Sequence, residues 1–131
     1  MEIKLSITSI LLFLCSCVLT EPYYVSEFYI YNQSEVKISL ILFNNKNNDT
    51  LTIEDGKYFY KKIGDEGGDF PRPFLVDSIK VVFHGKKELL YTWDNRTIRN
   101  PLLLDSYEET KISKTHCIFK YTFIKKDYME N

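Results

Sequence analysis

The sequence predicts an all-β fold, a single antiparallel β-sandwich of about seven strands that follows an N-terminal signal segment. Two observations lead to this prediction. Short runs in which apolar and polar residues alternate recur along the chain, separated by clusters of Gly, Pro, Asn and Asp. Aromatic residues, which favour strands, make up 15% of the sequence. Apolar residues at helical spacing are not sustained beyond the signal segment, so two packed sheets are favoured, with a small barrel as the alternative.

Strand-like segments occupy most of the chain. The clearest is 35–45, in which Val36, Ile38, Leu40 and Leu42 alternate with other residues, of which Glu35, Lys37 and Ser39 are polar. Asp55-Gly56 is a strong turn dipeptide, so we expect residues 50–63 to form a hairpin. Residues 77–93 predict a second hairpin that turns near His84. The seven expected strands are 23–32, 35–45, 50–54, 57–63, the two arms of 77–93, and 116–124.

The apolar side of each expected strand predicts the core, and the remaining segments predict its connections. Leu102 to Leu104 are expected to close one end of the core. Three Gly and two Pro predict a loop over 64–74, the segment 94–115 is expected to be irregular, and the polar tail after 124 is expected to form one helical turn. The expected core residues are Val36, Ile38, Leu40, Leu42, Ile79, Val81, Phe83, Leu89, Tyr91, Trp93, Cys117, Phe119, Tyr121 and Phe123.

The first residues are typical of a secretory signal. Lys4 precedes an apolar run of roughly ten residues, which is far shorter than the ~20 that a membrane-spanning helix needs. The run ends in Leu14-Cys15-Ser16-Cys17, which resembles the bacterial lipobox. The resemblance implies cleavage after residue 16 and acylation of Cys17 by diacylglycerol and a further chain such as palmitate. An ordinary secreted protein with incidental cysteines is the alternative.

These boundaries predict a signal peptide over 1–16, a lipid-anchored tether over 17–22 and a β-sandwich over 23–131. Removal of residues 1–16 from the 131-residue chain leaves 115, enough for one domain, and seven strands in that length are typical of an immunoglobulin-like sandwich. Only Glu21 is acidic in the tether, whereas surface-exported lipoproteins of Bacteroidales often carry an acidic run after the cysteine. We therefore expect the periplasmic face of the outer membrane rather than the cell surface.

Composition argues against several classes of partner and against a disulfide bond within the domain. The 17 basic and 18 acidic residues nearly balance, which argues against binding to nucleic acid or to anionic lipid head groups. Of the three cysteines, Cys15 leaves with the signal and Cys17 is consumed by lipid, so Cys117 has no intramolecular disulfide partner. We expect Cys117 to pack as a small apolar residue rather than to act as a nucleophile.

Asp65, Glu66 and Asp69 form the one acidic cluster that invites a metal interpretation. Their oxygens on a loop would suit Ca²⁺, but the spacing matches no EF-hand loop, so we expect a solvated acidic loop. Paired carboxylates across a cleft, as glycoside hydrolysis requires, are not recognisable in the sequence.

Zinc binding and nucleophilic catalysis are also disfavoured. His116 and Cys117 are adjacent on an expected strand and so point to opposite faces, and His84 lies in a turn, which leaves a zinc site short of ligands. Asp77-Ser78 lies near His84 in sequence, but no nucleophile turn is recognisable. We therefore expect no metal, no cofactor, no catalytic residues and no enzymatic activity.

Tyrosine residues provide the strongest candidate for a binding surface. Tyr29, Tyr31, Tyr58 and Tyr60 occupy alternate positions on two expected strands, and exposed aromatic side chains favour partner or carbohydrate recognition. Cross-strand aromatic pairing is the alternative interpretation of the same residues. Thr50, in Asp49-Thr50-Leu51, resembles the acceptor of Bacteroidales O-glycosylation. Three N-glycosylation sequons, at Asn32, Asn48 and Asn95, are expected to be chance in this Asn-rich chain.

The lipobox together with residues 77–91, 99–116 and 121–131 resembles short uncharacterised lipoproteins of gut Bacteroidales. The resemblance implies an envelope lipoprotein and supplies no catalytic residues. We therefore expect a lipid-anchored, non-enzymatic module that binds a protein or glycan partner. The alternative is a periplasmic immunity or inhibitor protein that neutralises a toxin or enzyme, which small size, an anchor and the lack of a catalytic set would suit.

Overall fold

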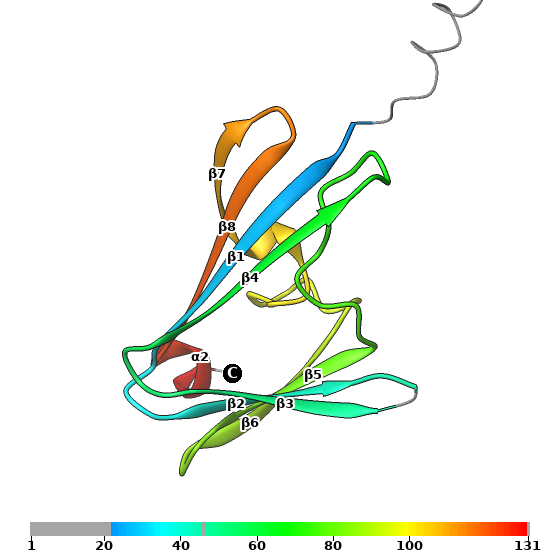
Figure 1. The fold of residues 1–131 in the computed structure, drawn as a ribbon. Coiled ribbons are helices and arrows are strands. Elements are labelled where there is room, and N and C mark those ends of the chain that lie inside the picture. The colour runs from blue at the N-terminus through cyan, green and yellow to red at the C-terminus, as the bar shows by residue number, and fades with distance from the viewer. Residues whose placement is uncertain (1–21, 46, 131) are drawn as a thin grey trace, which may run out of the picture.

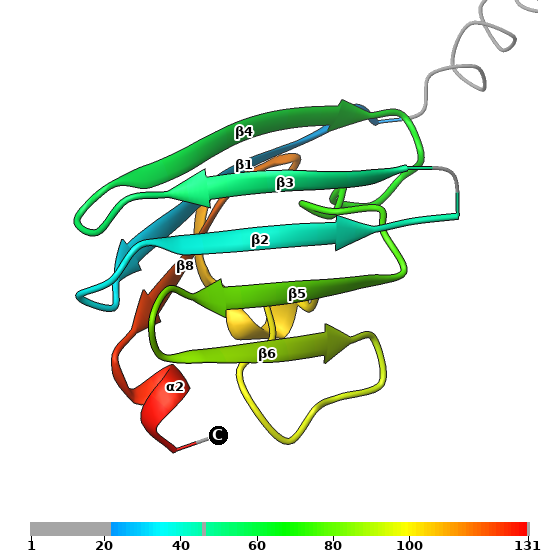
Figure 2. The ribbon, with the colours of Figure 1, turned by 90° about the horizontal axis from the view of Figure 1, so that it is seen from below.

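The computed structural model describes residues 22–45 and 47–130, which form two four-stranded sheets stacked as layers (Figure 1). Sheet A has the strand order β4-β1-β8-β7, and sheet B, seen face-on in Figure 2, has the order β3-β2-β5-β6. The predicted β-sandwich is confirmed, with eight strands in the described residues rather than seven. The elements are β1 (Tyr24–Gln33), β2 (Ile38–Phe43), β3 (Asn48–Ile53), β4 (Tyr58–Asp65), β5 (Ser78–Phe83), β6 (Lys87–Thr92), the 3-10 helix η1 (Leu104–Ser106), β7 (Glu108–Ser113), β8 (His116–Ile124) and the short helix α2 (Lys126–Met129).

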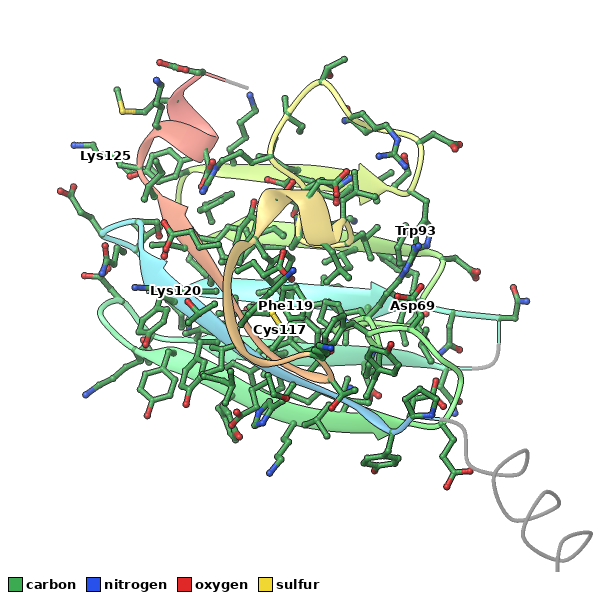
Figure 3. All side chains as sticks on the ribbon, turned by 90° about the horizontal axis from the view of Figure 1, so that it is seen from above. Asp69, Trp93, Cys117, Phe119, Lys120 and Lys125 are labelled. Carbon is green, nitrogen blue, oxygen red and sulfur yellow. The ribbon has the colours of Figure 1, made fainter. Side chains whose placement is uncertain are left out.

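The core lies between the sheets and is built from the alternate residues that the sequence predicts. Ile38 and Leu40 of β2 are fully buried, as are Phe28 and Ile30 of β1. Leu102 is fully buried as well, which confirms the expected closure of the core by 102–104. The other expected core residues are buried or pack against the buried cluster. In Figure 3, Cys117 and Phe119 of β8 lie among these interior side chains.

The predicted hairpin over 50–63 is wrong. β3 pairs with β2 in sheet B, whereas β4 pairs with β1 in sheet A, so the turn at Asp55-Gly56 carries the chain from one sheet to the other. The buried side chain of Asn32 contributes to this crossing, because its amide nitrogen donates hydrogen bonds to the carbonyl oxygens of Val36 (2.7 Å) and Ile53 (2.9 Å). A turn dipeptide predicts that the chain bends, but it does not specify which strands become neighbours.

The segment 94–115, expected to be irregular, contains strand β7. All six residues of β7 are exposed, and the strand lies at the edge of sheet A with β8 as its only neighbour. An edge strand with both sides open to water has no need of alternating apolar residues, so the pattern that identifies other strands is missing here.

The position of β1 at the centre of sheet A determines which residues face solvent together. β1 pairs with β4 in the antiparallel sense and with β8 in the parallel sense, the one parallel pair among the described strands. Since successive side chains of a strand alternate between faces, Ser26, Phe28 and Ile30 point into the core. Glu27, Tyr29 and Tyr31 therefore lie on the outer side of the sheet.

Candidate binding face

The register of β1 and β4 brings the four predicted tyrosines together on the outer side of sheet A. Tyr29 lies opposite Tyr60 and Tyr31 opposite Tyr58, with ring centroids 4.9 Å and 5.3 Å apart in the two pairs. These are the cross-strand contacts of the alternative interpretation. Pairing nevertheless leaves Tyr58 56% and Tyr60 42% exposed, so a large part of both side chains remains open to a ligand.

A carboxylate that the sequence analysis did not single out lies beside these rings. The hydroxyl of Tyr60 donates a hydrogen bond to Glu27 Oε1 (2.5 Å), and His116 Nε2 lies 2.6 Å from Glu27 Oε2. Because an ionised carboxylate only accepts hydrogen bonds, the histidine nitrogen that faces it carries a proton. The Glu27 side chain is only 17% exposed, so a charged group is held in place between two donors.

Hydrogen bonding shifts the pKa of Glu27 and that of Tyr60 in opposite directions. The bond from Tyr60, and after it the bond from His116, lowers the pKa of Glu27 below its ordinary value. The same bond raises the pKa of Tyr60 to about 12, because the neighbouring carboxylate disfavours a phenolate. Glu27 is therefore charged and Tyr60 neutral at neutral pH, and the hydrogen bond between them is charge-assisted.

The parallel pairing of β1 with β8 explains how His116 and Lys120 reach this surface. Tyr29 lies opposite Lys120, and the ammonium of Lys120 is 4.8 Å from the centroid of the Tyr31 ring. Alternation along 23–32 is a signal that places Glu27 on the same side as Tyr29. No local signal, however, indicates that the last strand lies parallel to the first, so His116 and Lys120 could not be assigned to the site from the sequence.

Tyr23 extends the surface at the far end of β4. A Cβ atom at position 64 would overlap the phenol oxygen of Tyr23, so Gly64 is the residue type that allows this ring to lie over the strand. Tyr23 is 54% exposed. We refer to the outer-side residues Tyr23, Tyr29, Tyr31, Tyr58 and Tyr60 as the tyrosine face.

The three carboxylates of the acidic loop over 64–74 do not gather around a common point. Asp65 and Asp69 accept hydrogen bonds from the nearby backbone amides of Gly67 and Phe70, and Glu66 is exposed. Within 22–45 and 47–130, no group of three or more His, Cys, Asp or Glu side chains could hold a metal ion. The loop borders a hollow of about 540 Å³, to which Lys61 and Arg72 add positive charge beside the two aspartates.

The other residues considered for chemistry lie apart from one another. Ser78 and His84 are at opposite ends of β5, and His84 Nε2 lies 2.8 Å from Ser39 Oγ rather than near Ser78. Cys117 is fully buried in the core, as expected, and burial is the main cause that raises the pKa of its thiol to about 11. A neutral, buried thiol is a poor nucleophile.

The predicted modification sites differ in accessibility. Thr50 is exposed on β3, on the outer side of sheet B, while Cys17 lies outside the described residues. Asn32 is fully buried with its amide already bonded, so the folded protein does not present this sequon to a glycosyltransferase. Among the residues that the structure describes, no helix is long and apolar enough to cross a bilayer.

The tyrosine face thus offers partly exposed aromatic rings, phenol hydroxyls and one carboxylate that is fixed by two hydrogen bonds. This arrangement suits non-covalent recognition, in which aromatic groups supply contact area and the polar groups orient the ligand. No protein-family model matches the chain, and no curated protein or solved structure is significantly similar to it.

Proposed function

We propose that this protein is a lipid-anchored, non-enzymatic module of the bacterial cell envelope that binds a partner through the tyrosine face. The observation that supports binding is the tyrosine cluster itself, with Tyr58 and Tyr60 about half exposed beside the fixed Glu27 carboxylate. Tyrosine is enriched where proteins bind partners, because it provides a large contact area with few rotatable bonds. A sheet needs no such cluster on its solvent side in order to fold.

The anchor belongs to the same proposal and is supported by the lipobox-like residues Leu14-Cys15-Ser16-Cys17. β1 begins at Tyr24, seven residues after Cys17, and seven residues span at most ~25 Å. A lipid on Cys17 would therefore keep the domain close to the membrane, at the periplasmic face of the outer membrane. The resemblance to lipoproteins of gut Bacteroidales fits this placement.

Crosslinking and pull-down of the lipidated protein from intact cells tests the binding role. We expect the unchanged protein to capture a specific partner and the Tyr58→Ala/Tyr60→Ala variant to lose it. Leu90→Ala is the matched control, because Leu90 is 56% exposed on the outer side of sheet B. Equal capture by the double variant and the control would refute the tyrosine face as the binding surface. Capture of a toxin or enzyme whose activity the protein suppresses would identify the inhibitor role instead.

Lipid labelling tests the anchor independently. We expect Cys17→Ser to abolish incorporation of labelled fatty acid and to release the protein from membranes, whereas Cys15→Ser does neither. Label retained by Cys17→Ser would show that the anchor assignment is wrong. Protease shaving of the same cells reports the membrane face, since a periplasmic protein is protected and a surface protein is degraded.

A further inference from the structure

We propose that the ligand of the tyrosine face is a linear, uncharged oligosaccharide that lies along β1 and β4. This inference rests on the proposed binding role and narrows it to one class of partner. Three properties of the face lead to it: the ligand meets side chains only, the face is long and narrow, and its charges balance.

The backbone of β1 is not available to a ligand. β1 is paired with β4 on one side and with β8 on the other, so its amide and carbonyl groups are used within the sheet. Peptides that bind β-sheets typically do so by adding a strand at a free edge, where the main chain supplies the hydrogen bonds. The free edge beside the face is that of β4. A peptide added there would extend the sheet sideways, whereas a ligand that lies over the rings of both strands meets only rings, hydroxyls and the Glu27 carboxylate.

The dimensions of the face suit a chain-like ligand. Its rings come from two neighbouring strands, which gives a width of about 10 Å. Tyr23 and Tyr31 mark its two ends, and eight residue steps of extended chain cover about 26 Å. The resulting strip of roughly 260 Å² is about a third of the ~800 Å² that each partner contributes to a standard protein–protein interface. A single polysaccharide chain is also long, narrow and one sugar ring wide.

The chemistry of the face matches that of a sugar. A pyranose ring presents C–H groups on its faces and hydroxyls around its rim, so it contacts an aromatic ring through one surface and polar groups through the other. Glu27 has acceptor capacity beyond its two present bonds, and the hydroxyls of Tyr29, Tyr31 and Tyr58 both donate and accept.

The charges around the rings do not favour an ionic ligand. Lys62 lies opposite Glu27 in the pairing of β4 with β1, and Glu108 lies opposite Lys120 in the pairing of β7 with β8. His116 is bonded to Glu27. Two lysines and two carboxylates thus border the rings, with His116 bonded to the same Glu27, so neither a strongly acidic nor a strongly basic ligand would gain much from this surface.

Several rings are held in place before a ligand arrives. Tyr60 is bonded to Glu27, Tyr31 lies under the Lys120 ammonium, and the rings of Tyr29 and Tyr60 contact each other. Ordering side chains on binding costs free energy, so rings that are already fixed reduce that cost.

Binding of the full-length protein in detergent to immobilised α- and β-linked glucan, mannan and xylan oligosaccharides tests this inference. We expect at least one of these neutral probes to bind and the affinity to fall at least tenfold in Tyr58→Ala/Tyr60→Ala. Tyr60→Phe keeps the ring but loses the bond to Glu27, so we expect it to weaken binding less than the double variant. Leu90→Ala is expected to bind as the unchanged protein does.

Two results would overturn the inference: no probe is bound, or the double variant binds as well as the Leu90→Ala control. If crosslinking in cells still captures a tyrosine-dependent protein, the glycan inference fails while the proposed binding role stands. If neither experiment shows a tyrosine-dependent partner, the proposed function fails as well. All substituted side chains are exposed, so each variant is expected to fold. Circular dichroism of each variant checks that unfolding is not the cause of a lost interaction.

Discussion

On the outer side of sheet A, residues far apart in sequence meet around one carboxylate, whereas the outer side of sheet B carries hydroxyl, aliphatic and charged side chains with a single aromatic ring, Phe43, among its described residues. Glu27 is bonded to Tyr60 and to His116, and His116 lies 89 residues further along the sequence, in the last strand. On sheet B, the Lys80–Glu88 ion pair is 3.8 Å long, and both side chains are well exposed. The outer residues of sheet B include Ser39, Ile41, Thr50, Thr52, Lys80, Val82, Glu88 and Leu90.

This difference separates the requirements of the fold from those of a binding surface. Both sheets cover the same buried cluster, and each contributes alternate apolar residues to it. The outer side of sheet B shows that a four-stranded sheet of this sandwich forms without a cluster of tyrosines on its solvent side. The five tyrosines and the Glu27 network on sheet A therefore exceed what the core demands, which is why we assign the binding role to that side.

The largest effect on stability is expected at Glu27 on sheet A, compared with Glu88 on sheet B. Glu27→Ala removes the acceptor of two hydrogen bonds and should lower the free energy of unfolding by about 1–2 kcal/mol. Glu88→Ala removes an exposed ion pair and should cost less than about 0.5 kcal/mol. Urea unfolding of both variants measures the difference. Equal losses would show that the two surfaces are energetically alike.

A second effect concerns the ionisation of Tyr60. Glu27→Gln removes the negative charge that opposes phenolate formation, so the pKa of Tyr60 should fall from about 12 toward the ordinary tyrosine value of ~10. NMR detection of the Tyr60 ring through an alkaline titration measures this change. Glu88→Gln, on the other surface, serves as the control and should leave Tyr60 unchanged. An unaltered Tyr60 titration in Glu27→Gln would show that the hydrogen bond is not formed in solution.

A smaller effect is expected in acid. The pKa of Glu27 is lowered by folding, so this residue contributes stability above its unfolded value of ~4.3, and the contribution is lost as pH falls through the folded value. Glu27→Gln should therefore lose less stability than the unchanged protein below pH ~4.3. Unfolding free energies measured across that range decide the point, and parallel curves for the two proteins would contradict it.

The smallest effect on stability is expected at Gly64. Gly64→Ala should displace the Tyr23 ring, which is the far end of a flexible side chain, and should change stability by less than about 0.5 kcal/mol. Partner capture should weaken to the same extent as in Tyr23→Ala. Both changes remove the same contact, that of the Tyr23 ring with the ligand. The double variant should therefore bind its partner no more weakly than either single variant does. Additive losses would show that Gly64 acts on binding in some other way.

The sequence predicts the core of this protein better than its surface. Burial of one face leaves a period of two, so residues such as Ile38, Leu40 and Phe123 are assigned correctly from alternation alone. Strand β7 is missed because its residues are all exposed and leave no such period. The four tyrosines are found as a pattern, but the proximity of His116 to Glu27 depends on which strands become neighbours, and this is decided by packing of the whole chain.

Sheet A also determines when the binding surface can form. Its two central strands are the first and the last of the domain, since Val25 pairs with His116 and Gln33 with Ile124. Contacts between such distant segments require closure of a long loop, which slows folding. The centre of the sheet, and the tyrosine face upon it, is absent until residue 124 has been synthesised. Sheet A is therefore expected to form late in synthesis, whereas all four strands of sheet B have been made by Thr92.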